Sequence, residues 1–299
     1  MLTRRAILMT PLAALAVRPV LEAAGTMTLA IHQQTSTPAG YKRSLEGWAK
    51  AGIRHVELTA NLLDDFLKND SLPAASRVLS DNGLTPVSAA CGIFALWDPG
   101  TNQATVLDNF RKRCEQFASL GLKRIYAPSV VNRKVTEDDY KAAAENMRAV
   151  GDVAKQFGLT AMIEFTRTST MIATLPTSLN VTRAAAHPNV APMIDCYHFW
   201  SGNNKLEDLD LIKPGEIGHM HFQDVPSMPR ELLDNTTRAI PGDGISPLTA
   251  ILGKLAAKGY AGSLSVELFL PKFTQADPFE LAAEIKRKGE AVMRQARVL

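Results

Sequence analysis

Segments with the pattern of a β-strand alternate with helix-like segments along nearly the whole chain, from Thr28 to the carboxyl terminus. The strand-like segments are short and rich in apolar or β-branched residues, whereas the segments between them repeat apolar residues with the period of an α-helix. The strand-like range 159–165 and the helical range 178–186 are one such pair. Strict alternation of this kind favours parallel strands that are connected by right-handed helical crossovers.

Eight strand–helix units can be counted in this way. We expect the strands in the ranges 28–34, 55–60, 84–91, 124–130, 159–165, 190–195, 217–225 and 263–270. We expect the helices in the ranges 41–52, 62–82 (in pieces broken near Pro73), 105–121, 136–158, 178–186, 206–212, 247–259 and 278–299. Eight units in a chain of 299 residues match the size of a (β/α)8 barrel of about 250 residues.

We therefore predict an α/β protein with a single (β/α)8 TIM-barrel domain over residues 25–299. The alternative is a doubly wound open sheet of parallel strands. That fold usually has a glycine-rich turn after its first strand, and this sequence has none.

The first residues resemble an export signal. Arg4 and Arg5 precede the short apolar run 11–17. Small residues that suit signal cleavage lie at 14–16, within this run, and at 23–24, after it. The apolar run is too short to cross a bilayer as a helix of about 20 residues. We predict that residues 1–24 are a twin-arginine signal peptide and that the mature protein is periplasmic, without stable membrane association. An apolar amino-terminal helix of a cytosolic protein is the alternative.

The overall charge and the cysteines exclude other classes. The formal net charge is only +3 for 299 residues, which gives no support to a surface that follows nucleic-acid phosphates. The three cysteines, Cys91, Cys114 and Cys196, are odd in number and widely spaced, so a disulfide framework is not expected.

Four ionisable residues lie where the last four predicted strands end. Glu164, Asp195 and Glu267 each follow an apolar run, and His221 shares one face of its strand with His219. The carboxyl ends of barrel strands form the active-site face, so these side chains are expected to meet there. Burying several unpaired carboxylates is costly, although each of them alone could instead form an ion pair or a cap.

The expected meeting of three carboxylates and one imidazole indicates a metal site. Oxygen-rich sites of this kind suit a hard or borderline divalent cation better than a structural zinc. We expect one Mn2+ ion, with Mg2+ and Co2+ as alternatives. His198 lies three residues beyond Asp195, where the chain can turn its side chain towards a substrate.

These residues carry a resemblance to a known family. The set is Glu164, Asp195-x-x-His198, His221, Glu267 and Arg238-x-x-Pro-Gly-x-Gly. It resembles the xylose isomerase-like TIM barrel superfamily of sugar isomerases and epimerases, and it is particularly similar to the ketose 3-epimerases and their inosose-processing relatives.

The resemblance implies a role for each residue. Glu164, Asp195, His221 and Glu267 would hold one divalent metal ion. Glu164 and Glu267 would also act as acid and base on opposite faces of the sugar, while His198 and Arg238 would bind substrate oxygens. A metal that chelates a carbonyl and its neighbouring hydroxyl acidifies the adjacent C–H, so a carboxylate can remove that proton and form an enediolate.

Three more residues are candidates for substrate contacts, each with an alternative. Glu57 could hydrogen-bond a substrate, or could be structural. Asp224, just past a predicted strand, could bind substrate or cap a loop. Trp97 could provide an apolar wall for a sugar ring, or could pack within its loop. The loop before Arg238 is longer than in compact epimerases, so Arg230 could take the place of Arg238.

The first functional hypothesis is a metal-dependent isomerase or epimerase that acts on an unphosphorylated sugar or polyol. The alternatives are a lyase that eliminates the aglycone from a 3-keto glycoside, and a non-catalytic sugar-binding barrel. An endonuclease of abasic DNA would need more histidines at the strand ends than this chain has. We therefore expect a small-molecule sugar as partner, no nucleic acid, and possible homodimers.

Overall fold

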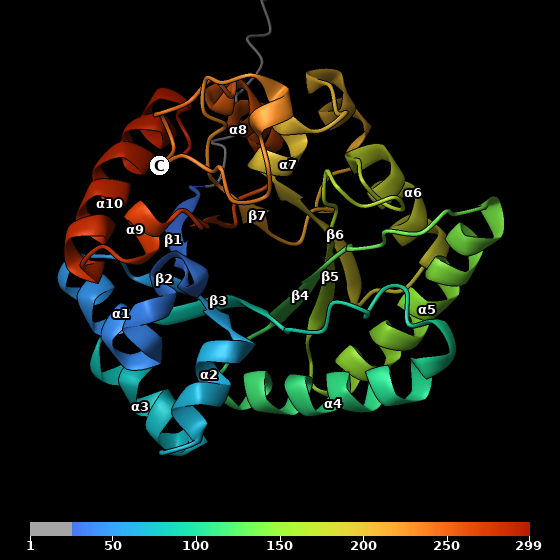
Figure 1. The fold of residues 1–299 in the computed structure, drawn as a ribbon, viewed down its shortest axis with the longest axis horizontal. Coiled ribbons are helices and arrows are strands. Elements are labelled where there is room, and N and C mark those ends of the chain that lie inside the picture. Colours follow the sequence, from blue (N-terminus) through green and yellow to red (C-terminus); the bar gives the residue numbers. More distant parts are fainter. Residues whose placement is uncertain (1–25) are drawn as a thin grey trace, which may run out of the picture.

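The computed structural model describes residues 26–299, and the predicted signal peptide lies outside this range. Eight parallel strands close into a barrel in chain order, from β1 to β8, which confirms the predicted single-domain TIM barrel. The strands are β1 (Thr28–His32), β2 (His55–Thr59), β3 (Thr85–Ala90), β4 (Arg124–Pro128), β5 (Thr160–Glu164), β6 (Val190–Asp195), β7 (Met220–His221) and β8 (Ser263–Val266). Figure 1 shows them at the centre of a ring of helices.

The helices cover the outside of the barrel. They are α1 (Gly40–Lys50), α2 (Ala60–Leu67), α3 (Leu72–Asp81), α4 (Gln103–Ser119), α5 (Glu137–Gln156), α6 (Leu175–Ala185), α7 (Cys196–Ser201), α8 (Leu248–Ala257), α9 (Pro271–Thr274) and α10 (Pro278–Gln295). Short 3₁₀-helices are η1 (Gln33–Ala39), η2 (Gly100–Asn102), η3 (Leu206–Leu211) and η4 (Arg230–Leu232). The apolar faces of these helices pack on the outer faces of the strands to form the main core.

The longest helix, α5, shows how local sequence sets the helix boundaries. The backbone N–H of Thr136 donates to the Asp139 carboxylate at 2.6 Å, and the pair forms a capping box at the start of the helix. Gly158, which has a φ of 66°, follows its end. A left-handed glycine of this kind commonly stops a helix, and the next strand begins at Thr160.

The structure differs from the expectations in several elements, among them the short helices η1, η2, η4 and α9, which were not expected. The range 206–211 is a 3₁₀-helix, and α7, which follows β6 directly, was not expected. Strand β7 covers only two of the nine residues predicted for it. The backbone nonetheless stays in contact with its neighbours, since Gly218 donates to Pro192 at 2.9 Å and Phe222 donates to Ser265 at 2.8 Å.

Side chains that point into the barrel form a second, smaller core below the strand ends. Tyr126, Met162 and Met193 pack together there, separate from the core between strands and helices. Gly218 is needed beside them, because a Cβ at this position would lie 2.7 Å from the Met162 sulfur. This layer closes the barrel from below and supports the polar side chains at the carboxyl ends of the strands.

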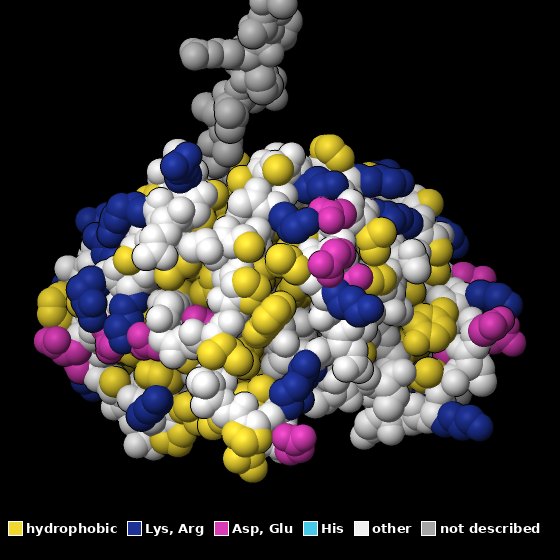
Figure 2. Space-filling view, turned by 90° about the horizontal axis from the view of Figure 1, so that it is seen from above, with side chains coloured by type: hydrophobic (Ala, Val, Ile, Leu, Met, Phe, Trp, Pro, Cys, Tyr) yellow, Lys and Arg dark blue, Asp and Glu magenta, His cyan; other side chains and the backbone are white. Residues whose placement is uncertain are grey.

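The surface carries charges of both signs. On the face shown in Figure 2, Lys and Arg side chains are spread around acidic and hydrophobic ones, without a continuous basic track. Among residues 26–299, no helix combines the length and the apolar composition needed to cross a membrane.

Candidate metal centre and active-site pocket

The four predicted metal ligands meet at the carboxyl end of the barrel. Glu164, Asp195 and His221 are the last residues of β5, β6 and β7, and Glu267 follows β8 directly. Each offers a ligand atom within 4.8 Å of those of the other three. All four side chains are buried. The structure therefore brings together the whole predicted set.

The imidazole of His221 lies between the carboxylates and the barrel interior. Its Nδ1 is 2.9 Å from Glu164 Oε1, 3.4 Å from Asp195 Oδ2 and 3.5 Å from Glu267 Oε2. Its Nε2 is 3.2 Å from Glu57 Oε2. Burial acts to lower the pKa of His221, but Glu57, Glu267 and Glu164 outweigh burial and hold that pKa well above its usual range, so the ring is protonated in this structure. A metal ion at Nδ1 would displace the Nδ1 proton and leave the Nε2 proton facing Glu57.

Glu57 is fully buried and serves two histidines at once. Its Oε2 accepts a hydrogen bond from His219 Nε2 at 3.0 Å, in addition to the contact with His221. Burial acts to raise the pKa of Glu57, but the two imidazoles outweigh burial and hold that pKa well below its usual range. Glu57 is therefore an anion inside the barrel, beneath the four candidate metal ligands Glu164, Asp195, His221 and Glu267 (the metal cluster).

The three ligand carboxylates differ in their electrostatic environment. Burial, together with the nearby charges of Asp195 and Glu267, raises the pKa of Glu164 to about 8. Burial acts in the same direction on Asp195 and Glu267, but the guanidinium of Arg238 outweighs it and lowers the pKa of both. Carboxylates this close cannot all ionise without a further positive charge.

Arg238 comes from the long loop between β7 and α8 and is almost completely buried. Its Nη1 contacts the Glu267 carboxylate and lies 3.2 Å from Asp195 Oδ2. Its Nη2 donates to His198 Nε2 at 3.1 Å, and the backbone N–H of Arg167 points to the other ring nitrogen, Nδ1, at 3.4 Å. Burial lowers the pKa of His198 to about 4, which keeps this ring uncharged at neutral pH.

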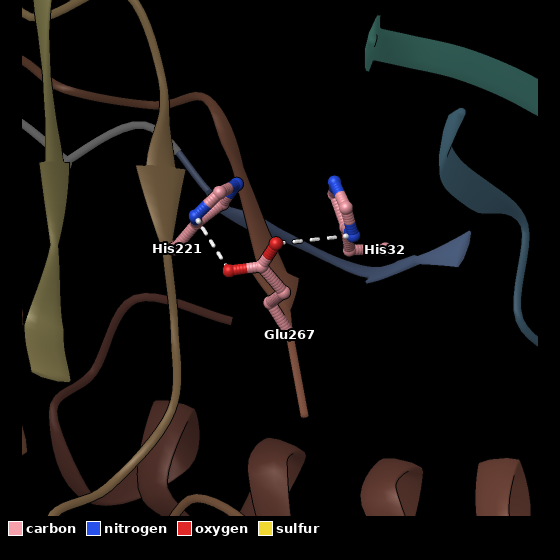
Figure 3. A group of neighbouring side chains, drawn as sticks. All are labelled: His32, His221 and Glu267. Atoms are coloured by element: carbon pink, nitrogen blue, oxygen red, sulfur yellow. Dashed lines mark ion pairs between the residues drawn. The ribbon is translucent and has the colours of Figure 1, made fainter. Parts of the chain in front are cut away.

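Glu267 lies between two imidazoles, from His221 on one side and His32 on the other (Figure 3). His32 Nδ1 is 3.4 Å from Glu267 Oε1. The hydroxyl of Tyr126 is 2.9 Å from His32 Nε2 and donates to Glu267 Oε1 at 3.5 Å. Strands β1 and β4 thus support the carboxylate that follows β8.

A pocket of about 540 Å³ opens above these residues. Glu164, Glu267, His198 and Arg238 line it, whereas Asp195 and His221 lie behind the lining. The two glutamates therefore combine positions in the metal cluster with direct access to a ligand in the pocket.

The structure places the other three predicted substrate residues away from the pocket lining. The Asp224 carboxylate accepts from the backbone N–H groups of Gly242, Gly244 and Ser246 at 2.9 to 3.1 Å, so it organises the loop that carries Arg238. Trp97 is 1% exposed and donates its indole N–H to Ala127 O at 2.8 Å. Glu57 lies beneath His221. Asp224 therefore organises a loop, Trp97 packs within its loop, and Glu57 supports His221.

Sequence reasoning overlooked two residues that contact the cluster. Gln223 donates to Asp195 Oδ2 at 2.6 Å, and Tyr126 reaches Glu267 from inside the barrel. Gln223 could have been found, because it continues the alternation of His219 and His221 along one strand face. Tyr126 sits in the run Arg-Ile-Tyr-Ala-Pro, where nothing in the sequence separates it from a packing tyrosine.

The residues present fit a divalent cation. Three carboxylates and one imidazole form an oxygen-rich donor set. With Glu57 beneath them, four buried carboxylates face one guanidinium, so positive charge is in deficit even when His221 is protonated. One divalent ion would offset most of this negative charge and allow Glu164 to ionise.

Comparisons with known proteins agree on one family. A family model described as xylose isomerase-like TIM barrel matches residues 45–293. An inosose isomerase from Halalkalibacterium halodurans is 25% identical over 254 residues, which are 83% of this chain and 90% of the relative. A D-psicose 3-epimerase from Ruminiclostridium cellulolyticum is 24% identical over 249 residues, which are 78% and 79% of the two chains.

A solved structure has the same fold. The crystal structure of IolI protein with a binding zinc atom has a TM-score of 0.83 and 23% sequence identity, and the match covers 90% of this chain and 99% of that one.

Proposed function

The chain belongs to the xylose isomerase-like TIM barrel family. From the geometry of its site, we propose that it is a divalent-metal-dependent isomerase or epimerase that acts on an unphosphorylated sugar or polyol. The observation that carries the proposal is the access of two glutamates to one pocket. Glu164 from β5 and Glu267 after β8 both line it, and two strands separate them in the barrel.

These two carboxylates can approach a ring from different sides. One of them removes the proton from the carbon next to a carbonyl, and the substrate becomes an enediolate. The other delivers a proton to the opposite face, which inverts the configuration, or to the neighbouring carbon, which moves the carbonyl. The contact with the Arg238 guanidinium holds Glu267 at the pocket wall.

Glu164, Asp195, His221 and Glu267 would hold the metal ion. When bound, a divalent ion supplies Lewis acidity, which polarises the substrate carbonyl and stabilises negative charge on its oxygen. We propose Mn2+ first, since the donor set is rich in oxygen, with Mg2+ and Co2+ as alternatives. The zinc in the IolI crystal structure adds Zn2+ to the ions that should be tested.

His198 and Arg238 are the proposed substrate-binding residues. Both line the pocket, and they hydrogen-bond to each other at 3.1 Å. The Arg238 guanidinium lies 4.6 Å above the ring of Phe269, which holds its plane in place. Polar side chains fixed in this way can orient substrate hydroxyl and carbonyl oxygens without reorganisation during the reaction.

A lyase is the second candidate. Removal of a proton next to the carbonyl of a 3-keto glycoside can be followed by loss of the aglycone instead of reprotonation. The size of the pocket favours this alternative, because space continues beyond the residues that surround the metal cluster. Both reactions begin with the same proton abstraction.

We also propose that the protein acts in the periplasm. The proposal rests on Arg4 and Arg5 before a short apolar run. It predicts that replacing both arginines with lysine leaves the full-length protein in the cytosolic fraction, whereas the unchanged chain appears in the periplasmic fraction as a mature form. If the unchanged chain and the double lysine variant were distributed equally between the cytosolic and periplasmic fractions, export by the twin-arginine route would be contradicted.

Deuterium incorporation from D2O tests the proposed chemistry. Metal-loaded protein is incubated with free ketoses, inososes and 3-keto glycosides, and exchange at carbons next to the carbonyl is followed by NMR. Glu267→Gln should remove the exchange, while Glu216→Gln, a carboxylate paired with Arg183 on the outside of the barrel, should not. Release of an aglycone would select the lyase. Metal binding without exchange on any substrate would leave a sugar-binding barrel.

A further inference from the structure

The pocket extends well beyond the metal cluster. The cluster belongs to β5–β8, but residues that follow β2, β3 and β4 also line the pocket. Among them are Asn61 and Asp64 in α2, Phe94 after β3 and Val130 after β4. The total volume of about 540 Å³ lies in the middle of the range of about 300–1,000 Å³ for drug-sized ligands, and a single sugar ring is a small ligand on that scale.

The wall after β2–β4 is mainly apolar. Ala60, Ala90 and Gly92 form part of it. Phe94 and Val130 stand at the mouth with 66% and 44% of their surfaces exposed, although both are hydrophobic. Large exposed hydrophobic side chains beside a pocket usually mark a contact site for a ligand.

The charges in this wall neutralise each other. The guanidinium of Arg113 pairs with Asp64 through two contacts of 2.5 and 2.6 Å, and it also donates to Gln116 at 2.9 Å. Because this guanidinium is already bound on both sides, it offers no free cation for a phosphate. The wall therefore suits a neutral group better than an anionic one.

We propose that the wall formed by Ala60, Ala90, Gly92, Phe94 and Val130 is a second subsite, which binds an aromatic group attached to the reacting ring. The inference rests on the proposed function, which places the ring at Glu164 and Glu267, and it deepens that function by naming the substrate class. The substrate is a neutral aryl-substituted sugar or cyclitol rather than a free monosaccharide or a sugar phosphate. Phe94 provides a face on which the aromatic group stacks.

Binding of unreactive glycosides tests the subsite separately from the chemistry. Phenyl and methyl β-D-glucoside are titrated into the metal-loaded mature protein by calorimetry. We expect the phenyl glucoside to bind about tenfold more tightly. Phe94→Ala and, to a smaller degree, Val130→Ala should reduce this ratio towards one. Phe279→Ala removes another partly exposed phenylalanine, in α10 outside the pocket lining, and should keep the ratio.

Equal affinities for the two glucosides would overturn the subsite, and so would a ratio that Phe94→Ala does not change. The absence of binding by the phenyl glucoside would also overturn it. The deuterium exchange experiment is independent of this result. If the protein shows no deuterium exchange but prefers the phenyl glucoside in a way that depends on Phe94, the subsite is supported and the proposed isomerase is refuted. If it shows exchange without this preference, the proposed isomerase chemistry is supported and the subsite is refuted.

Discussion

The two halves of this barrel are built from the same strand–helix units, but they present different chemistry at one pocket. Strands β5 to β7 end at Glu164, Asp195 and His221, and Glu267 follows β8, whereas β2, β3 and β4 end at Thr59, Ala90 and Pro128. The second half thus carries the candidate metal ligands, and the first half carries an apolar wall. The comparison teaches that the reactive side chains depend on which residue follows each strand, while the scaffold stays the same.

The first half still supports the second from inside the barrel. Glu57 of β2 reaches His221, and His32 of β1 and Tyr126 of β4 reach Glu267. The contacts of Glu57 and Tyr126 cross the barrel, whereas His32 lies on β1, the strand next to β8. The two halves are therefore chemically different but in direct contact. Four changes can break or sharpen this comparison.

The largest effect is expected from His221→Asn. This change removes the nitrogen that faces Glu164, Asp195 and Glu267, and we predict that metal binding weakens by more than about 100-fold, since loss of an outer partner alone costs about 10 to 100-fold. Isothermal titration with Mn2+ measures the effect. The matched change in the first half is His55→Asn at the start of β2, which should leave the affinity as it is. Equal affinity in both variants would mean that the metal is held elsewhere.

The next effect is expected from Glu57→Gln. The amide keeps the size of the side chain but loses the charge that holds the His221 proton on Nε2, and we predict metal binding about tenfold weaker. The same titration, with thermal unfolding of each variant, separates orientation of His221 from general destabilisation. Glu46→Gln in α1 changes an exposed glutamate and is the control. Unchanged affinity would confine the metal site to β5–β8.

A smaller effect is expected from Tyr126→Phe. The variant loses the hydroxyl that connects His32 to Glu267, and one hydrogen bond to a charged group contributes about 1.5–3 kcal/mol at most, less at the 3.5 Å found here. We predict deuterium exchange about fivefold slower with unchanged metal affinity. Tyr140→Phe in α5 serves as the control. A loss of metal affinity would show that β4 takes part in the metal site itself.

The smallest effect is expected in α5, which connects the two halves. The hydrogen bond from Arg133 and those from Thr136 lower the pKa of Asp139 to about 2 from its ordinary value of 3.8. A carboxylate whose pKa is lowered by folding stabilises the folded state at pH values above its ordinary pKa. This stabilisation is lost as the pH falls from 3.8 towards about 2. Asp139→Asn should therefore lower the unfolding temperature by about one degree or less at pH 7, because solvent screens its contacts, and the difference should shrink below pH 4.

The control for α5 is Asp138→Asn, which alters the neighbouring exposed carboxylate that pairs with Lys141. It should have the weaker effect at pH 7. Metal affinity should be the same in both variants, because α5 holds the two halves together without contributing to either wall. A pH-independent difference for Asp139→Asn would contradict the assigned charge effect.

Much of the barrel could be predicted from the sequence, because strand and helix periods are local signals. The meeting of Glu164, Asp195, His221 and Glu267 could be predicted as well, since parallel strands bring their carboxyl ends to one face. Strand β7 was predicted too long because its apolar pattern continues into residues that pack without regular strand geometry. Helix α7 was not predicted because Asp195, expected only as a ligand, also caps a helix by accepting from His198 N at 2.7 Å.

The pocket wall could not be predicted in the same way. Phe94 and Trp97 are both aromatic, lie three residues apart and follow the same strand. The loop turns one to the pocket and buries the other, and that choice depends on the Ala127 carbonyl that receives the indole N–H. Asp224 was equally ambiguous, since its backbone partners lie about 20 residues further along the chain. Tertiary contacts of this kind leave no local signal.

The location of the bound metal is the most direct test of the difference between the halves. Crystals of the mature protein grown with Mn2+ give an anomalous difference map at the manganese edge. We predict one peak in each chain, in contact with Glu164, Asp195, His221 and Glu267. A peak between Glu57 and His219, or a protein that binds no divalent ion at these four residues, would contradict the assignment of the metal site to β5–β8.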